Sequence, residues 1–173
     1  MHLQRVTESD LPDVVDLTNL AFRGNQGWTI ESKYIEGRRI NLEMLQEDMK
    51  ENPDALLLIW RDETAGTLLG SVWLEPKEGG VWYMGLLAVR PDQQGQQLGR
   101  RMLEASEAAM RERGAVKVVI SVVNVRERLM GWYERRGYVR TGERKPFPYG
   151  DERVGLPLRD DLEFVVLEKG LIG

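Results

Sequence analysis

Two glycines followed by two arginines, at the junction of a predicted strand and a predicted helix, form the stretch of this chain best suited to bind an anion. Pro91 ends the strand because proline has no N–H to donate to a neighbouring strand. An apolar row with helical spacing follows. The turn from Gln94 to Gly99 therefore lies at a helix N-terminus, where unpaired N–H groups and the helix dipole favour phosphate. Arg100 and Arg101 oppose that dipole, so we expect an anion near them.

Two common phosphate loops differ from this turn. The P-loop requires Lys-Ser or Lys-Thr after its second glycine, where this chain has Arg100 and Arg101. The dinucleotide fingerprint requires three glycines, and only Gly95 and Gly99 are present in the turn. A plain strand-to-helix turn with two solvated arginines is the alternative, and glycine spacing alone does not separate it from an anion site.

The turn Gln94-Gly95-Gln96-Gln97-Leu98-Gly99 resembles the acetyl-CoA loop of the GNAT superfamily of N-acetyltransferases, Gln/Arg-x-x-Gly-x-Gly/Ala, which also follows a strand and a proline. Gln94, Gly95, Leu98 and Gly99 fit that pattern. Gln97 stands where the family usually has its middle glycine, although it still supplies a backbone N–H.

A second stretch supports the resemblance. Asn124, followed by Trp132-Tyr133-Glu134-Arg135-Arg136-Gly137-Tyr138, resembles the superfamily signature Asn-x(n)-Tyr-Glu-Lys-x-Gly-Phe in order and in spacing. The two matches together cover residues 81–138. The pair identifies the chain as similar to GNAT acetyltransferases.

The resemblance implies direct attack of an amine on the acetyl thioester within a ternary complex. The leaving thiolate needs a proton, and Tyr133 matches the family tyrosine that often donates it; its alternative role is a core aromatic. The amine must lose a proton, and many relatives place a glutamate on the central strand, which here reads Trp82-Tyr83-Met84-Gly85-Leu86-Leu87. Glu31, Glu75 and an ordered water are the alternatives for this base.

The resemblance also implies binding residues. The central strand would pair its backbone with the pantetheine arm, the turn would bind the pyrophosphate, and Asn124 would either bond the cofactor or end a strand. The predicted cofactor-binding residues are Leu87, Ala88, Val89, Gln94, Gly95, Gln96, Gln97, Leu98, Gly99, Arg100 and Asn124. The acceptor usually lies under the first two helices and their connection, which places Trp28, Glu31, Tyr34 and Arg39 near it; an aromatic ring and a carboxylate suit a cationic amine.

Composition excludes several other classes of protein. A length of 173 residues predicts one domain over residues 1–173, which the resemblance implies is an N-acetyltransferase domain. A formal net charge of −4, without a Lys/Arg block, argues against nucleic acid and membranes as partners. The absence of cysteine and the single histidine, His2, argue against disulfides, thiolate catalysis, Ser-His-Asp chemistry and a metal site. With no signal-peptide or membrane-spanning pattern, we expect a soluble cytoplasmic protein, and a homodimer is one open alternative for its assembly.

Hydrophobic spacing predicts the elements that position these residues. We expect strands at 3–6, 55–61, 67–75, 81–90, 116–123 and 162–167, and helices from residue 9 or 10, around 42–49, at 98–113 and at 126–136. The segment from Arg144 to Asp160 is too long for an idle connection, so we expect a lid or an oligomer contact there.

The resemblance and these elements predict an α/β fold, α+β by some schemes. It has a mixed, mostly antiparallel sheet of six to seven strands, about four flanking helices and a splayed central strand pair for CoA. The predicted function is acetyl transfer from acetyl-CoA to a primary amine of a small-molecule or amino-acid-like acceptor. The alternatives are acetylation of protein N-termini or lysines, and a non-catalytic CoA-sensing module.

Overall fold

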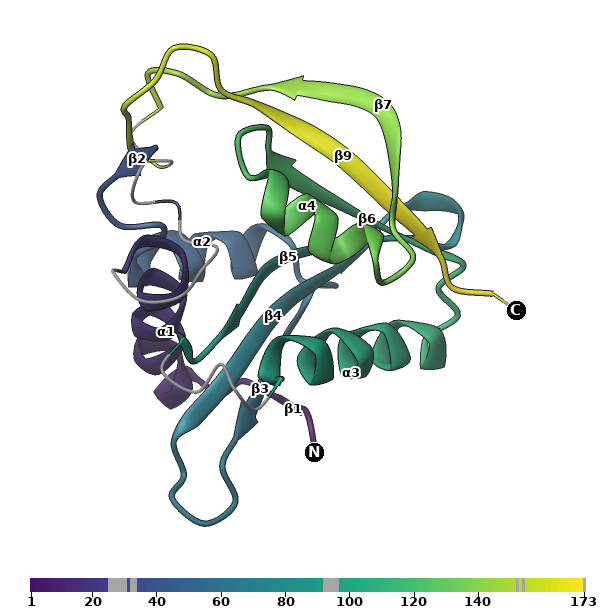
Figure 1. Ribbon diagram of the computed structural model, residues 1–173. Coiled ribbons are helices and arrows are strands. Elements are labelled where there is room, and N and C mark those ends of the chain that lie inside the picture. The colour runs from purple at the N-terminus through teal and green to yellow at the C-terminus, as the bar shows by residue number, and fades with distance from the viewer. Residues whose placement is uncertain (25–30, 32–33, 92–96, 152, 154, 173) are drawn as a thin grey trace.

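The computed structural model describes residues 1–24, 31, 34–91, 97–151, 153 and 155–172. Its centre is a seven-stranded sheet in the order β1-β3-β4-β5-β6-β9-β7 (Figure 1). The strands are β1 (Gln4–Arg5), β3 (Leu56–Arg61), β4 (Leu68–Pro76), β5 (Val81–Val89), β6 (Lys117–Val123), β7 (Val139–Pro146) and β9 (Glu163–Gly170). Among the strand pairs of this sheet, β5 and β6 are parallel and the others antiparallel. A separate antiparallel pair joins β2 (Ile35–Glu36) to β8 (Leu156–Pro157).

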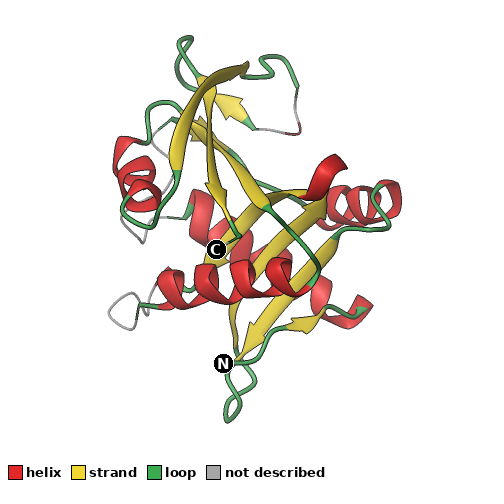
Figure 2. Ribbon diagram, turned by 90° about the vertical axis from the view of Figure 1, so that its right-hand side faces the viewer, coloured by secondary structure: helices red, strands yellow, loops and turns green. Residues whose placement is uncertain are grey.

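Helices cover both faces of the sheet (Figure 2). They are α1 (Leu11–Arg23), α2 (Leu42–Glu51), α3 (Leu98–Glu112) and α4 (Glu127–Glu134), with short 3-10 turns at Glu8–Asp10 and Glu78–Gly80. Within the described ranges, every helix is too short or too polar to cross a membrane.

The apolar residues of β3, which are buried on both faces of the sheet, explain this layered arrangement. Leu57 and Ile59 pack against α1 and α2, whereas Leu56, Leu58 and Trp60 pack on the other face with α3. Because successive side chains of a strand point to opposite faces, a strand buried on both sides reads as a continuous apolar run. The observed sheet and four helices confirm the predicted fold class.

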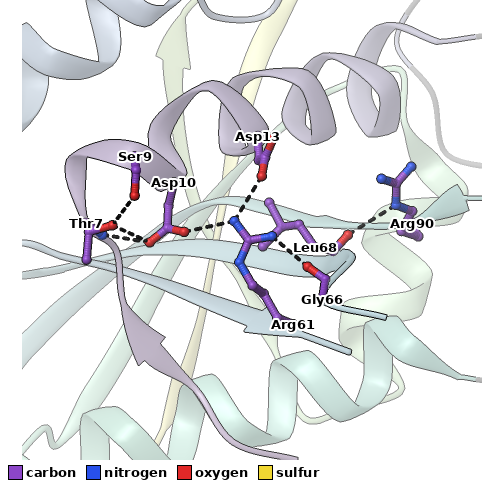
Figure 3. Close-up of polar contacts among 8 residues, drawn as sticks. All are labelled: Thr7, Ser9, Asp10, Asp13, Arg61, Gly66, Leu68 and Arg90. Atoms are coloured by element: carbon purple, nitrogen blue, oxygen red, sulfur yellow. Dashed lines mark hydrogen bonds and ion pairs between the residues drawn. The ribbon is translucent and has the colours of Figure 1, made fainter. Parts of the chain in front are cut away.

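A polar network fixes the start of α1 to the hairpin between β3 and β4 (Figure 3). The backbone N–H of Thr7 donates to Asp10 Oδ2 at 2.8 Å, which caps the first turn. Arg61 Nη2 donates to Asp10 at 2.8 Å and to Asp13 at 2.9 Å, and its Nη1 donates to the Gly66 carbonyl at 2.9 Å. The helix whose C-terminal end reaches the candidate site is thus held at its N-terminal end.

The prediction of a loop from Arg144 to Asp160 was partly wrong, because Arg144 lies inside strand β7. All residues of β7 are exposed and four of its eight residues, from Arg140 to Lys145, are charged, so the strand has no apolar alternation to reveal it. Charged side chains are the usual protection of an edge strand such as this one. The rest of the segment contributes β8, which pairs with the chain after α1.

Candidate active site

The central strands β5 and β6 separate after a short stretch of pairing. Val81, Trp82 and Tyr83 pair with Lys117, Val118 and Val119, and the remaining residues of the two strands do not pair with each other. The strand β6 continues to pair with β9 along its whole length and β5 continues to pair with β4 as far as Val89, so the sheet divides between β5 and β6. The splayed central pair predicted from the sequence is therefore present.

A β-bulge in β5 lies at the point of separation. Ser71 of β4 pairs with Ala88 and Trp73 pairs with Gly85, so Leu86 and Leu87 together face one residue of β4. Leu86 has φ of 52°, a left-handed conformation that is uncommon for a leucine. Bulges bend the strand that carries them and cluster next to active sites, which accounts for the divergence of β5 from β6.

The splayed strands border a cavity of about 740 Å³. Its walls combine apolar groups from the two strands with charged groups from segments distant in the sequence. The residues that line it include Phe22, Arg23, Glu31, Arg39, Glu75, Lys77, Tyr83, Gly85, Leu86, Leu87, Val89, Gln97, Leu98, Gly99, Arg100, Arg126, Trp132, Tyr133, Arg136, Lys145 and Phe147. An elongated substrate would thus meet strand backbone, a helix N-terminus and several cations.

The N-terminus of α3 faces this cavity. Gln97, Leu98, Gly99 and Arg100 line it, and the side chain of the N-cap residue Gln97 makes no capping hydrogen bond. Gln97 has φ of 54°, so this residue adopts the left-handed conformation that glycine accepts most easily, at the place where the family usually has glycine. Uncapped N–H groups at a helix N-terminus suit a phosphate oxygen. Gln94, Gly95 and Gln96 lie outside the described residues.

The two arginines of this turn point to different partners. Arg100 lines the cavity and makes a long ion pair with Glu104 at 3.8 Å. The guanidinium of Arg101 instead lies over the Trp60 ring at 4.8 Å from its centroid. A cation–π contact of this kind explains Arg101 without an anion. Arg100 is therefore the arginine available for a phosphate.

Tyr133 is a buried tyrosine on α4 whose side chain lines the cavity. Its ring makes edge contacts with Trp132 and Tyr138, with centroids 5.1 Å and 5.2 Å away. Burial raises the pKa of the Tyr133 hydroxyl well above its ordinary value, and the charge of Arg126 lowers it by less. The phenol is thus protonated at neutral pH, which a proton donor requires.

Glu31 lines the cavity and lies between two arginines. Its Oε1 accepts from Arg23 Nε at 3.0 Å and its Oε2 accepts from Arg126 Nη1 at 3.1 Å, and all three side chains are buried. The predicted carboxylate for a cationic amine does line the cavity, but its charge is already neutralised. Burial lowers the pKa of both arginines and the carboxylate opposes this effect.

Glu75 and Tyr83 face the cavity from paired positions on β4 and β5. Glu75 accepts a hydrogen bond from Trp73 Nε1 at 3.1 Å and forms an ion pair with Lys77. A Cβ on Gly85 would lie 2.8 Å from the Tyr83 hydroxyl, so the tyrosine fills the space beside this glycine. Burial raises the pKa of Tyr83, so it is also a protonated phenol at neutral pH.

Other predicted site residues have different positions. Asn124 accepts from the Glu163 N–H at 3.1 Å and donates to the Asp161 carbonyl at 3.0 Å, which is the strand-terminating role. Ala88 is buried against α1 on the other face of β5, and Tyr34 packs beside Arg159 outside the cavity lining. Trp28 lies outside the described residues. Cofactor contacts of Asn124 and Ala88, and acceptor contacts of Tyr34 and Trp28, stay predictions.

Arg126 and Tyr83 are cavity residues that the sequence did not single out. Arg126 precedes α4 and resembles an exposed helix start, and Tyr83 reads as one aromatic in an apolar strand. Neither has a motif of its own. Their positions in the site depend on contacts between segments that are distant in sequence. Arg126, for example, contacts Glu31, which lies 95 residues before it.

The splayed strands, the N-terminus of α3 and the buried tyrosine border one cavity, and the two motifs that resemble those of GNAT acetyltransferases contribute to its lining. The sequence pattern of the Acetyltransferase (GNAT) family matches residues 13–138. This range spans most of the chain, from α1 to the end of the second motif. The chain belongs to the GNAT acetyltransferase family.

Two curated relatives share about half of the chain. It is 38% identical over 88 residues to the mycothiol acetyltransferase of Propionibacterium freudenreichii subsp. shermanii, covering 47% of this chain and 27% of the relative. It is 31% identical over 84 residues to the mycothiol acetyltransferase of Beutenbergia cavernae, covering 49% and 28%. The matched part thus spans just over a quarter of each relative.

Solved structures match along the whole chain. An aminoglycoside 6'-acetyltransferase type Ii has a TM-score of 0.67 at 19% identity and covers 100% of this chain and 99% of its own. The ribosomal-protein-alanine N-acetyltransferase from Brucella melitensis has a TM-score of 0.67 at 18% identity, covering 98% and 99%. At these identities the likeness shows the fold alone. The names of the two proteins refer to different acceptors, an aminoglycoside and a ribosomal-protein alanine.

Proposed function

We propose that this chain is an acetyl-CoA-dependent N-acetyltransferase acting on the primary amine of a small-molecule or amino-acid-like acceptor. The observation that carries the proposal is one cavity bordered by the splayed backbone of β5, the N-terminus of α3 and the protonated phenol of Tyr133. These are the three groups needed to bind the arm of CoA, bind its phosphates and protonate its sulfur.

Each part of the donor has a matching group. The backbone of residues 87–89, unpaired with β6, would hydrogen-bond the amides of the pantetheine arm as an added strand does. The uncapped N–H groups of Leu98 and Gly99, with the Arg100 side chain, would hold the pyrophosphate. The thioester, when bound, supplies the acetyl group, and Tyr133 would donate the proton that the departing sulfur takes.

The acceptor amine must release one proton as its nitrogen bonds to the acetyl carbon. Glu31 is unsuited to accept that proton because two arginines already hold its carboxylate. Glu75 lines the same cavity from β4, and Lys77 is its one ion-pair partner among the described residues. We therefore assign the base to Glu75, acting directly or through a water.

The cavity walls favour a compact acceptor over an extended peptide. Lys145 and Phe147 from the segment after β7 line the cavity, and β8 of that segment pairs with β2 beside Glu31. These contacts cover the acceptor side, whereas acceptance of an extended chain needs an open groove. We also propose a single domain over residues 1–173 and a cytoplasmic location for the protein.

A thiol-release screen tests this function. The panel contains amino acids, polyamines, aminoglycosides and short peptides with acetyl-CoA, and mass spectrometry confirms the acetylated amine. We expect CoA release with free small amines, and little with peptides. Peptide acetylation in preference to free amines would favour the protein acetyltransferase alternative. Binding of acetyl-CoA without turnover on any amine would favour the sensing module.

A further inference from the structure

We propose that the acceptor amine carries a carboxylate, and that Arg126 and Arg39 bind this carboxylate at the end of the cavity beside Phe22. This inference rests on the proposed acetyl transfer and narrows its substrate class to amino acids and similar amino-carboxylates. The carboxylate site is built from α1, the chain before α2 and the start of α4.

The charges at this end of the cavity do not balance. Among the described residues, Arg23, Arg39 and Arg126 line it together with one carboxylate, that of Glu31. Elsewhere on the described wall, Glu75 is paired with Lys77, and Lys145 adds a further cation. A cavity with an excess of positive charge attracts an anion and disfavours a polycation.

Arg126 has hydrogen-bonding capacity that the described residues do not use. Its side chain is 7% exposed, and Nη1 donates to Glu31. Nε is buried without a hydrogen-bond partner, and Nη2 makes no hydrogen bond to a described residue. Nε and Nη2 form one edge of the guanidinium, and this edge binds carboxylates with two parallel hydrogen bonds. An unsatisfied buried donor is unfavourable, so a ligand oxygen would remove that cost.

Arg39 lies beside the same aromatic ring as Arg126, that of Phe22. The backbone N–H of Arg39 donates to Asn19 Oδ1 at 2.6 Å, which fixes the residue to α1. Its guanidinium lies over the Phe22 ring at 5.5 Å from the centroid, and that of Arg126 lies 5.9 Å from the same centroid. Within the described residues, no carboxylate lies within ion-pair distance of Arg39. The guanidinium groups of Arg39 and Arg126 therefore lie near one aromatic ring, and Glu31 is the one carboxylate among the described residues that pairs with either of them.

This arrangement places a carboxylate at a useful distance from the reacting groups. Arg126 immediately precedes α4, and Tyr133 lies seven residues later in the same helix. Two helical turns correspond to roughly 10 Å along the axis, a gap that one small acceptor fills. Binding of the carboxylate by the arginines would point the amine toward Tyr133 and Glu75.

Matched pairs of acceptors test the inference. Each amino acid is compared with its amide, which keeps the amine and loses the carboxylate charge. We expect kcat/KM for the acids to exceed that for the amides by roughly tenfold or more, the effect of a charged hydrogen-bonded pair. Preference for amides, or for polyamines and aminoglycosides, would overturn the inference while leaving acetyl transfer intact.

Three variants assign the effect to these residues. Arg39→Gln leaves the buried ion pairs in place, and Arg126→Lys keeps the charge but loses the two-pronged edge. Both are expected to raise KM for the acids at least about fivefold with an unchanged KM for acetyl-CoA. The values of kcat/KM for acids and for amides should then become similar. Arg5→Gln, a change on an exposed residue of β1, is the matched control and should change neither the KM for the acids nor the KM for acetyl-CoA. Equal losses for acids and amides would contradict the assignment.

Direct binding separates this inference from acetyl transfer. Calorimetric titration of acids and amides into the protein saturated with CoA is independent of turnover. Binding of acids alone, lost in Arg39→Gln, supports the carboxylate site even if no amine is acetylated. Equal binding of acids and amides, or binding of neither, refutes it.

Discussion

Replacement of Tyr133 by phenylalanine removes the proposed proton donor and keeps the ring. The edge contacts with Trp132 and Tyr138 survive the change because they involve ring carbons. The Tyr133 hydroxyl makes no hydrogen bond to a described residue, so its loss leaves no protein partner there unsatisfied. We expect the free energy of unfolding to change by less than about 1 kcal/mol. The melting temperature should therefore shift by no more than about 4 °C.

Turnover should respond much more strongly than stability. A positioned proton donor contributes roughly 10²–10⁴-fold, so kcat of Tyr133→Phe should fall by that factor. The affinity for acetyl-CoA should remain unchanged, because the proton is needed only as the thiolate leaves. The assay measures kcat by thiol release, affinity by calorimetry and melting temperature on the same preparation.

Tyr138→Phe is the matched control. The Tyr138 hydroxyl donates to Glu107 Oε2 at 2.8 Å in the core, away from the cavity. Its removal leaves a buried carboxylate with one fewer donor, so we expect a loss of about 1–3 kcal/mol of stability with kcat retained. Full turnover in Tyr133→Phe, or equal effects of the two substitutions on stability and kcat, would refute the role of Tyr133 as the acid.

Three further outcomes follow from the same geometry. Arg100→Gln should weaken acetyl-CoA binding by roughly threefold to tenfold in calorimetry and leave acetyl-pantetheine, which lacks the pyrophosphate, unaffected; equal weakening of both would contradict the phosphate contact. Gln97→Gly should leave the melting temperature unchanged or higher, because relief of about 1–2 kcal/mol of left-handed strain exceeds the entropy that glycine adds to the unfolded chain, whereas Gln97→Val should lower it. Since burial raises the folded-state pKa of Tyr133, its contribution to stability is complete below about pH 10 and is lost as pH rises further. Denaturant unfolding above pH 10 should therefore show a steeper loss in the wild type than in Tyr133→Phe, and parallel curves would contradict this burial.

Local patterns predicted most of the fold. The continuous apolar run of β3 and the valine-rich β6 follow from burial on both faces, and Pro91 marks the end of the central strand before α3. Strand β7 was missed because it is exposed along its whole length and pairs only with β9 at the edge. Its position depends on a partner distant in sequence, which periodicity does not record.

The candidate site was predicted unevenly for a related reason. Tyr133 and Gly99 belong to motifs with fixed local spacing, and both line the cavity. Arg126 is recognised as a site residue by its contacts with Glu31 and Phe22, which are distant from it in sequence and close to it in the fold. Arg101 was assigned to an anion by its position, but the ring of Trp60 accounts for it.

Calorimetric titration with acetyl-CoA tests the central claim, that the space between β5 and β6 binds the acetyl donor. The experiment uses the whole chain at neutral pH and low salt, with two temperatures so that a small binding enthalpy at one of them is not mistaken for absence of binding. The structure predicts saturable binding of one acetyl-CoA per chain, with a negative heat-capacity change from burial of the pantetheine arm. Absence of binding at millimolar acetyl-CoA at both temperatures would contradict the account.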